Sequence, residues 1–482
     1  MARVPVAVVI GVDVGTSGVR TVAATSAGTV LAQAQEVLPS RRSAHDALHE
    51  QEPEDWWKAV CQTVGNIAKT LKASEYRRRI RGVAFTSTSG SLVVTDSGGV
   101  PVRPAILYDD PRGREIAAEL NHGVDPGASP FNSSFSLVKA LWVWKTEPRT
   151  WQRIKRLMHP ADWLAGKLTG QFGVSDYSHA MKLGFDVETW KWNEALSVSG
   201  LPSELLPTVV RPGQKIGEVS QQAAEETGLP VGTAVVAGAT DGMASLIASG
   251  AKAPGDGSTT LGTTFVWKVL TRIKPCLASG MYCHYHPANL WAPGAASNTG
   301  PGSLLADDPT VEPREWDRWA AAHLPTPIVC YTLRARGERF PFDNSVAKTF
   351  WEGEPRDSVD RYAAQLQSLA FVERWGYERL QACGVEVGPT VFSTGAAAAS
   401  RVLAQLRSNV LHRIVIRCRY PTSAFGAAVL AAAETFYSGD LGAAIEGMTH
   451  VSETASPDPA AALRFAEVYK GFREACARRG YA

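Results

Sequence analysis

Short apolar runs separated by glycine-rich polar turns open the chain, and this pattern predicts a hairpin of buried strands. One apolar run covers residues 6–10 and another covers residues 19–24. Runs of this length, rich in valine and isoleucine, are typical of buried strands. We therefore expect residues 13–18 to form the turn that joins two paired strands.

Helical periodicity is clearest at residues 53–71, where large apolar residues recur at steps of three and four after a proline. This spacing predicts an amphipathic helix that faces a core. Further helices are expected at residues 357–382 and 424–433, and short strands at residues 80–95, 235–237 and 391–393. The tryptophan-rich segment 135–192 is expected to be mostly core, because buried aromatic side chains usually serve packing.

Asp241 follows the apolar run at residues 235–237 and precedes a segment of small apolar residues that is expected to form a helix. A carboxylate at the end of a buried strand, near a helix start, is placed to point into a cleft. The alternative is that Asp241 only caps the helix, a common use of aspartate at this position.

The opening turn carries an acid, two hydroxyl groups and glycines, as Asp13, Gly15, Thr16 and Ser17. Glycines let backbone amides approach a polyanion, hydroxyl groups add donors, and a nearby carboxylate can hold hydrated Mg²⁺. The turn is no Walker loop, because no Gly-Lys-Ser/Thr follows. An ordinary hairpin turn would explain the glycines without requiring the acid and both hydroxyl groups.

Four further turns are candidate binding elements, at residues 87–91, 108–110, 297–302 and 394–398. The first offers hydroxyl groups, including that of Ser89, and the second places Asp110 after an apolar run. Small residues in the last turn let a flat ligand or a phosphate approach the backbone. Its alanines are also good helix formers, so a simple helix start is the alternative.

Composition narrows the class of protein. The chain has 482 residues, a hydrophobic content of 45% and a net charge of +2. This length favours two or more domains, and the charge balance indicates no nucleic-acid partner. Seven scattered cysteines and the absence of a signal or membrane-spanning pattern lead us to expect a cytoplasmic protein with no membrane partner. A metal site at Cys276, Cys283, His284 and His286 is a weaker possibility, because their spacing fits no standard zinc pattern and also suits a strand.

Taken together in chain order, these motifs resemble the FGGY family of carbohydrate kinases over nearly the full length. The matching pieces are Gly11–Arg20, Leu107–Arg112, Pro212–Gly217, Gly228–Asp241, Gly262–Thr264 and Gly426–Ala428. The resemblance implies an α/β fold of two ribonuclease-H-like, actin-like ATPase domains around a central cleft. We expect domains at residues 1–249 and 250–437, with a helical appendage at residues 438–482.

The resemblance also implies roles for individual residues. Asp241 is expected to be the general base, with Asp13 and Asp241 near Mg²⁺ and with Asp13, Ser89, Asp110 and Asp241 on the sugar. ATP contacts are expected from Gly15, Thr16, Ser17, Gly262, Thr263, Thr264, Gly300, Gly395, Ala396 and Asn409. The expected partners are a small sugar and ATP, in a monomer or a homodimer. Sugar hydroxyls are poor nucleophiles, so a carboxylate would accept the proton as the γ-phosphoryl group leaves ATP.

Two features bear on substrate and activity. The Thr88–Ser91 turn, with Asp109 and Asp110 after it, looks most like the plant and cyanobacterial branch that phosphorylates D-ribulose, with D-xylulose as the second choice. The family usually has two or three glycines where this chain has Gly395 followed by three alanines. That difference leaves open a catalytically degenerate sugar or nucleotide sensor, and a filament-forming or chaperone ATPase of the same fold is a wider alternative.

Overall fold

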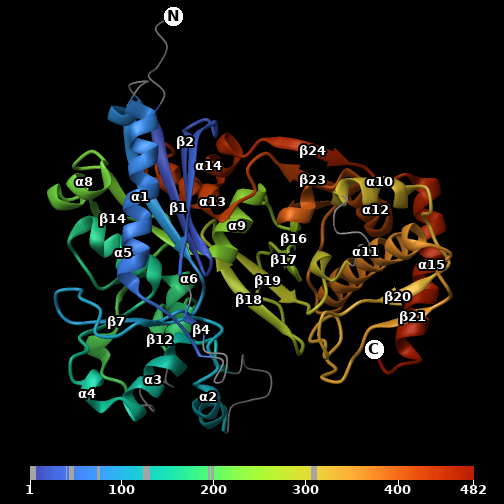
Figure 1. The fold of residues 1–482 in the computed structure, drawn as a ribbon, viewed down its shortest axis with the longest axis horizontal. Coiled ribbons are helices and arrows are strands. Elements are labelled where there is room, and N and C mark those ends of the chain that lie inside the picture. The colour runs from blue at the N-terminus through green and yellow to red at the C-terminus, as the bar shows by residue number, and fades with distance from the viewer. Residues whose placement is uncertain are drawn as a thin grey trace, which may run out of the picture. The chain divides into compact units, whose positions relative to one another are not determined.

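The computed structural model describes residues 7–39, 41–42, 48–72, 76–122, 131–193, 196, 200–304 and 312–481 (Figure 1). The chain divides into two compact units, of which unit 1 is Met1–Ala248 with Thr422–Thr449 and unit 2 is Ser249–Pro421 with His450–Ala482. The segment Thr422–Thr449 therefore belongs with the N-terminal unit, whereas the expected domains place it in the second domain and the appendage. None of the helices in the described ranges is long and apolar enough to cross a membrane.

Unit 1 is built on a six-stranded sheet with the order β14-β15-β6-β1-β2-β3. β15, β6 and β1 run parallel, and β14, β2 and β3 each pair antiparallel with their neighbours. The strands are β1 (Val8–Gly15), β2 (Gly18–Thr25), β3 (Val30–Val37), β6 (Ile80–Ser87), β14 (Lys215–Glu218) and β15 (Ala234–Thr240).

Helices cover both faces of this sheet, and side-chain alternation along β1 shows why. Ile10 and Val12 share a hydrophobic core with Trp56 and Leu164 from the helices of one face. Gly11 points to the other face, where an added Cβ would lie 1.9 Å from the carbonyl oxygen of Ala424. The absence of a side chain at Gly11 thus lets a helix lie directly on the sheet. The covering helices are α1 (Pro53–Lys72) and α5 (Pro160–Thr169) on the first face and α13 (Ser423–Phe436) on the second.

Further helices and strands belong to unit 1. They are β5 (His49–Gln51), β7 (Val93–Thr95), β8 (Ala105–Ile106), α2 (Arg114–Leu120), α3 (Ser136–Thr146), β9 (Arg156–Met158), β10 (Val174–Asp176), α6 (Tyr177–Ala180), β13 (Thr208–Val210), α8 (Gln221–Thr227), α9 (Asp241–Ser249) and α14 (Leu441–Met448). α9 starts directly at the end of β15, so its first residue lies at the carboxyl edge of the sheet.

Unit 2 is built on a seven-stranded sheet with the order β18-β19-β17-β16-β22-β23-β24. As in unit 1, antiparallel strands lie on one side of a parallel group. In unit 2, β18, β19, β17 and β16 pair antiparallel, and β16, β22 and β23 run parallel. The elements are β16 (Gly257–Leu261), β17 (Phe265–Val269), β18 (Met281–His286), β19 (Leu290–Ala296), α10 (Pro313–Ala321), α11 (Ser358–Ala382), β22 (Thr390–Thr394), α12 (Arg401–Leu411), β23 (Ile414–Cys418), β24 (Val451–Ala455) and α15 (Pro459–Ala477).

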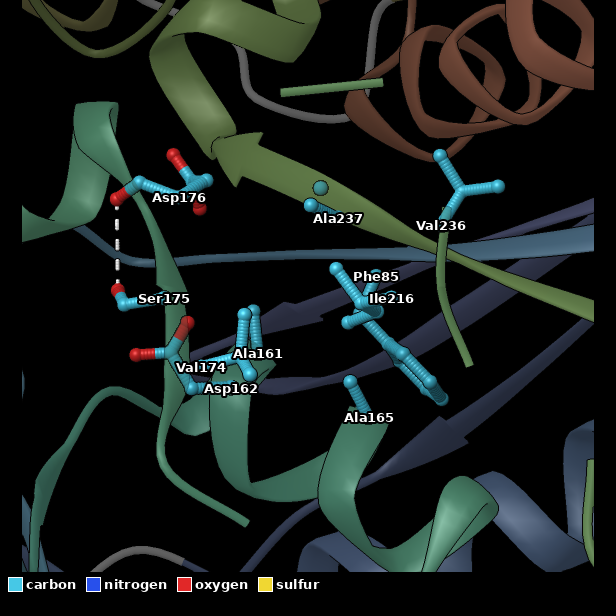
Figure 2. A pocket seen from close by; sticks show the side chains of 11 residues that line it. Phe85, Ala161, Asp162, Ala165, Val174, Ser175, Asp176, Ile216, Val236 and Ala237 are labelled. Atoms are coloured by element: carbon cyan, nitrogen blue, oxygen red, sulfur yellow. Dashed lines mark hydrogen bonds between the residues drawn. The ribbon is translucent and has the colours of Figure 1, made fainter. Parts of the chain in front are cut away.

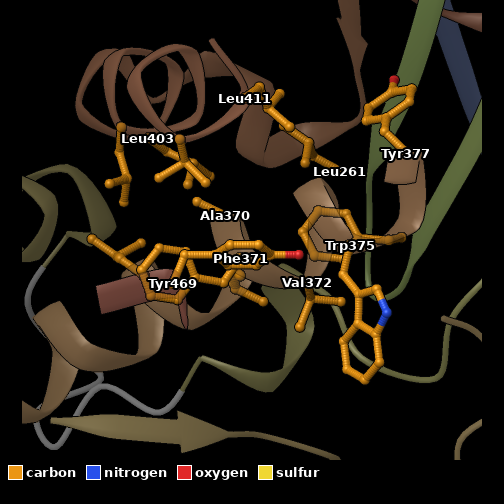
Figure 3. Close-up of a cluster of buried hydrophobic side chains, with 14 of the residues drawn as sticks. Leu261, Ala370, Phe371, Val372, Trp375, Tyr377, Leu403, Leu411 and Tyr469 are labelled. Atoms are coloured by element: carbon orange, nitrogen blue, oxygen red, sulfur yellow. The ribbon is translucent and has the colours of Figure 1, made fainter. Parts of the chain in front are cut away.

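The core of unit 2 is aromatic and centres on α11. Phe371, Trp375 and Tyr377 of this helix are buried together with Leu403 and Tyr469, as Figure 3 shows. The ring centroids of Phe371 and Tyr469 lie 5.4 Å apart, within the range of favourable aromatic contacts. This core explains why the helix predicted at residues 357–382 has so many apolar positions: most of its faces are buried.

The expected α/β class is confirmed, and the two sheets share the connectivity expected of ribonuclease-H-like units. Some boundaries differ from expectation. β1 continues to Gly15, so Asp13 lies within a strand and only Thr16 and Ser17 form the tip of the hairpin. Gly262–Thr264 forms the turn between β16 and β17, and the segment after residue 438, expected to be helical, contains β24 as well as helices.

Candidate active site

Two carboxylates, Asp13 and Asp241, come together at the carboxyl edge of the unit 1 sheet. Asp13 is only 8% exposed, and Arg20, its partner across the hairpin, lies 3.8 Å from it. Burial and the negative charge of Asp241 raise the pKa of Asp13 to about 7, and Arg20 offsets this only in part. Asp241 is the first residue of α9, and its Oδ1 accepts a hydrogen bond from the Gly242 amide.

This pair suits a divalent cation. The buried Oδ1 of Asp13 has no hydrogen-bond partner in the described part of the protein. A buried, unpartnered carboxylate oxygen is costly, and a second acid nearby increases the cost. Oxygen ligands of this kind are the ones that Mg²⁺ prefers, and it usually takes only one or two carboxylates from the protein. The residues present therefore fit the expected metal.

The hairpin tip beside Asp13 is held by its backbone and presents its side chains outward. Gln51 donates to the carbonyl oxygen of Thr16, and the Leu38 amide donates to that of Ser17. Within the described ranges, neither the Thr16 nor the Ser17 hydroxyl group hydrogen-bonds to the protein. Anchored backbone and uncommitted hydroxyl groups are what a phosphate-binding turn requires.

The turn that follows β6 uses some of its hydroxyl groups internally and leaves one available. Thr88 and Ser91 hydrogen-bond to each other at 2.8 Å, and Ser91 also accepts from the Tyr108 amide. Ser89 is partly exposed, and its hydroxyl group makes no hydrogen bond within the described residues. Gly90 has a φ of +89°, and a Cβ there would meet the Ser134 carbonyl oxygen at 1.9 Å, so only glycine suits this close turn.

Asp110 occupies a different position from the one expected of a sugar ligand. It is completely buried, and its two oxygens accept hydrogen bonds from the Arg112 guanidinium and amide and from the His49 amide. These partners hold the pKa of Asp110 below its usual range despite burial. Its neighbour Asp109 is more exposed and hydrogen-bonds to the His49 ring at 2.7 Å. Asp109 is thus the better placed of the two acids for a ligand, a distinction that the sequence motif did not reveal.

Unit 2 holds a cavity of about 730 Å³, within the size range of small-molecule sites. Gly262, Thr263, Gly302, Ala396 and Ser400 line it, so the hairpin and the alanine turn expected to contact ATP share one cavity. Ser400 caps α12, whose N-terminus therefore faces this region.

Gly300 and Gly395 pack closely against the hairpin that lines that cavity. A Cβ on Gly300 would lie 2.6 Å from the Thr264 backbone, and one on Gly395, which has a φ of +86°, would lie 2.5 Å from the Leu261 carbonyl oxygen. Both glycines therefore permit close packing of the loops that carry the hairpin.

Thr264, Gly300, Gly395 and Asn409 were also expected to contact ATP, and they do not line this cavity. Asn409 lies towards the end of α12, where its Oδ1 accepts hydrogen bonds from Gln405 and from the Asp458 amide. It lines a separate cavity together with residues of α15. Asp317, in contrast, is part of the nucleotide-sized cavity and accepts a hydrogen bond from Tyr362. Its position inside an amphipathic helix gave no sequence signal for such a role.

The cysteine and histidine segment forms an ordinary strand. β18 pairs antiparallel with β19, so Cys283 and His284 point to opposite faces. His286 is fully buried, and burial together with the charge of Lys268 lowers its pKa to about 3.

Comparison with known proteins identifies the family. The sequence pattern of the N-terminal domain of the FGGY family of carbohydrate kinases matches residues 8–248, and that of the C-terminal domain matches residues 290–435. The chain belongs to the FGGY family of carbohydrate kinases. It is accordingly an ATP-dependent carbohydrate kinase, which favours the enzyme over the sensor that the alanine turn had left open.

Individual FGGY proteins resemble it along most of their length. A xylulose kinase of Staphylococcus epidermidis is 24% identical over 464 residues, covering 94% of this chain and 92% of that protein. The structure of a xylulose kinase from Rhodospirillum rubrum superposes with a TM-score of 0.86 at 24% identity, covering 98% of each chain. A gluconate kinase from Lactobacillus acidophilus reaches a TM-score of 0.84 at 18% identity, covering 98% of both chains. The fold is thus shared by kinases named for different sugars.

Proposed function

We propose that this FGGY kinase transfers the γ-phosphoryl group of ATP to the terminal hydroxyl group of D-xylulose. Full-length similarity to proteins named xylulose kinase supports this sugar better than the D-ribulose favoured by the Thr88–Ser91 turn. The observation on which the mechanism rests is the pair of acids, Asp13 and Asp241, at the end of the unit 1 sheet.

In the proposed reaction, Asp241 accepts the proton of the sugar hydroxyl group as that oxygen attacks the γ-phosphorus. Asp13 and Asp241 would hold Mg²⁺, which supplies positive charge to the phosphate oxygens when it is bound. The amides and hydroxyl groups of the Gly15–Gly18 turn, and the Gly262–Thr264 hairpin of unit 2, would bind phosphate oxygens. Because proton acceptance and phosphate binding are separate tasks, different residues can be tested for each.

D-ribulose remains the second candidate, because the Thr88–Ser91 turn, with Asp109 and Asp110 after it, resembles the branch of the family that phosphorylates this sugar. D-xylulose and D-ribulose differ only in the configuration at C3, so discrimination depends on a few polar contacts. A missing hydrogen bond to a site built for it costs a large factor in kcat/KM, whereas a small misfit costs little.

A panel of ketopentoses, ketohexoses, polyols and aldonates in a coupled assay for ADP release tests the substrate. We expect the highest kcat/KM for D-xylulose, with D-ribulose next. The Asp241→Asn variant, measured on the same panel, serves as the control for contaminating kinases. A kcat/KM for D-ribulose above that for D-xylulose would return the assignment to D-ribulose, and preference for a polyol or an aldonate would refute both.

A further inference from the structure

A short buried segment of unit 1 joins two strand ends that carry the candidate site. β10 ends at Asp176, and α6 follows as a single helical turn. Asp176, Ser178 and His179 are 2%, 6% and 0% exposed. Figure 2 shows Asp176 and Ser175 beside Asp162 and Ala237 of β15, around a closed cavity of about 10 Å³, room for about one water molecule.

Asp176 and His179 form a fully satisfied ion pair. Oδ1 of Asp176 accepts from the Ser178 amide, the Ser178 hydroxyl group and the His179 amide, and Oδ2 accepts from Nδ1 of His179 at 2.5 Å. Asp162, Asp176 and His179 each offer a ligand atom within 4.8 Å of the others. Asp162, however, is hydrogen-bonded to His159, and Asp176 is hydrogen-bonded to His179. Both carboxylates are therefore engaged by histidines, so we do not interpret this cluster as a metal site.

The pair reaches both strand ends through hydroxyl groups. Ser178 Oγ accepts a hydrogen bond of 2.9 Å from the amide of Thr240, the last residue of β15 and the one directly before Asp241. Nε2 of His179 lies 3.0 Å from Oγ of Ser87, the last residue of β6 and the one directly before the Thr88–Ser91 turn. One buried unit thus contacts the backbone of the residue before Asp241 and the side chain of the residue before the Thr88–Ser91 turn.

We propose that Asp176, Ser178 and His179 are positioning residues, which hold Asp241 through Thr240 and the Thr88–Ser91 turn through Ser87. The proposal rests on the proposed role of Asp241 as the base. A displacement of about 1 Å at a reacting group can lower a rate about 100-fold, so a fixed strand end has direct kinetic value. Buried, mutually locked side chains are also the usual means of fixing such geometry.

Electrostatics favours the charged form of His179 at neutral pH. Burial alone would lower its pKa, but the charge and hydrogen bond of Asp176, with further contributions from Asp162 and Asp241, raise it to about 9. Both ring nitrogens then carry protons, so His179 donates to Asp176 and to Ser87 at the same time. The ring of His159, whose centroid lies 5.3 Å away, completes the titratable groups packed around it.

The same segment contains a matched control. Ser175 is 1% exposed and lies three residues before Ser178, yet among the residues that the structure describes its hydroxyl group bonds only to the Asp176 carbonyl oxygen and, at 3.4 Å, to His159. Similarly, His159 is fully buried and bonded to Asp162 and Ser136, without a bond to β6 or β15. Ser175→Ala and His159→Gln therefore remove comparable buried hydrogen bonds that do not reach the site.

The test compares Ser178→Ala with Ser175→Ala in the full chain. We expect kcat of Ser178→Ala to fall at least tenfold, with KM for ATP within twofold of the original value and a thermal midpoint no lower than that of Ser175→Ala. Ser178→Thr, which keeps the hydroxyl group, should recover most of the lost kcat. Equal kcat in the two alanine variants, or no recovery with threonine, would overturn the proposal.

A second comparison, of His179→Gln with His159→Gln, tests the contact with Ser87 before the Thr88–Ser91 turn. It does not depend on the stability of the serine variants. We expect His179→Gln to lower kcat and to raise KM for the sugar several-fold more than His159→Gln. Equal effects on both constants would show that His179 only contributes to packing. Asp241→Asn is measured in parallel: an active Asp241→Asn variant would refute the proposed base, whereas an inactive one with unaffected Ser178→Ala and His179→Gln variants would refute positioning alone.

Discussion

Asp241 lies in a position that a helix cap or a general base could occupy, and substitution distinguishes the two roles. Asp241→Asn keeps the size and can still cap a helix, but it cannot accept a proton. We expect kcat to fall by roughly 10²–10⁴-fold while sugar affinity changes little. Steady-state kinetics and sugar titration calorimetry measure the two quantities.

Asp440 offers the matched control, because its side chain caps α14 of the same unit by accepting from the Ala443 amide. Asp440→Asn should leave kcat unchanged, since asparagine is an equally good cap. If Asp241→Asn behaved like Asp440→Asn, Asp241 would be a cap and the proposed mechanism would be wrong.

Asp13 predicts a pH dependence of stability in the absence of Mg²⁺. Its pKa of about 7 in the folded protein lies above the ordinary aspartate value of 3.8, so the folded state binds this proton more tightly than the unfolded state. The stabilising contribution is therefore complete below about pH 3.8 and is lost as the pH rises through about 7. We expect the free energy of unfolding, from urea titrations, to decline between about pH 4 and pH 7 more steeply than in Asp13→Asn, and the two proteins to have similar slopes above pH 8.

Mg²⁺ provides the second half of this test. A cation that binds only the folded state raises the free energy of unfolding. At pH 8 we expect Mg²⁺ to raise it far more in the original protein than in Asp13→Asn. Parallel pH slopes for the two proteins, with equal stabilisation by Mg²⁺, would remove Asp13 from the proposed metal site.

The alanine turn between β22 and α12 is an element in which neighbouring methyl groups have different surroundings. Ala396 is exposed and lines the nucleotide-sized cavity, whereas Ala397 also packs against the core of unit 2. We expect Ala396→Gly to lower KM for ATP several-fold by relieving crowding, with KM for the sugar nearly unchanged. Ala397→Gly should instead lower the thermal midpoint, because it removes a packed methyl group.

Kinetics with varied ATP and differential scanning fluorimetry separate these effects. An unchanged or higher KM for ATP in Ala396→Gly would mean that the methyl group at this position does not hinder the nucleotide.

Local elements were the part of the structure that sequence could predict best. The helix at residues 53–71 and the helix at residues 424–433 follow from apolar spacing, and the strands around Asp13 and Asp241 follow from short valine-rich runs. The pattern of apolar residues does not predict which helix packs on which strand. Nothing in the composition of α13 indicates that it packs on β1, because the decisive residue is Gly11, far away in the sequence.

The site was predictable where function leaves a local motif and unpredictable where it depends on long-range pairing. The glycine and hydroxyl turn at residues 13–18 stands out from its own residues, whereas the phosphate role expected of residues 262–264 came from the family resemblance. Asp110 could not be distinguished from Asp109, because the choice depends on Arg112 and on His49 from another strand. The family resemblance implied that Asn409 contacts ATP, yet its hydrogen bonds link α12 to the start of α15.

For the whole molecule, the discontinuity of unit 1 leads to a prediction about fragments. Residues 1–248 lack α13 and α14, so the face of the sheet next to Gly11 would be uncovered. We expect this fragment alone to aggregate or remain poorly folded, because the large apolar surface loses its cover. Joining residues 1–248 to residues 422–449 through a flexible Gly/Ser linker should restore a folded unit.

Circular dichroism, thermal unfolding and sugar titration of the two fragments test this. Cooperative unfolding of residues 1–248 without the added segment would contradict the role given to α13. Solubility of only the joined fragment, with sugar binding but no ATP turnover, is the expected result.

The division of the chain also sets the order in which the protein can form during translation. The six strands of the unit 1 sheet and the helices α1 and α5 on one of its faces are synthesised before residue 249, but α13, which covers the other face, is synthesised only after residues 249–421. At typical elongation rates of about 5–20 residues per second, that interval lasts roughly ten to thirty-five seconds. During this interval, one face of the sheet that carries Asp13 and Asp241 is not covered by α13, while most of unit 2 is being synthesised. The unit that carries Asp13 and Asp241 is thus completed late in synthesis, and we expect chaperones to act mainly on the nascent chain.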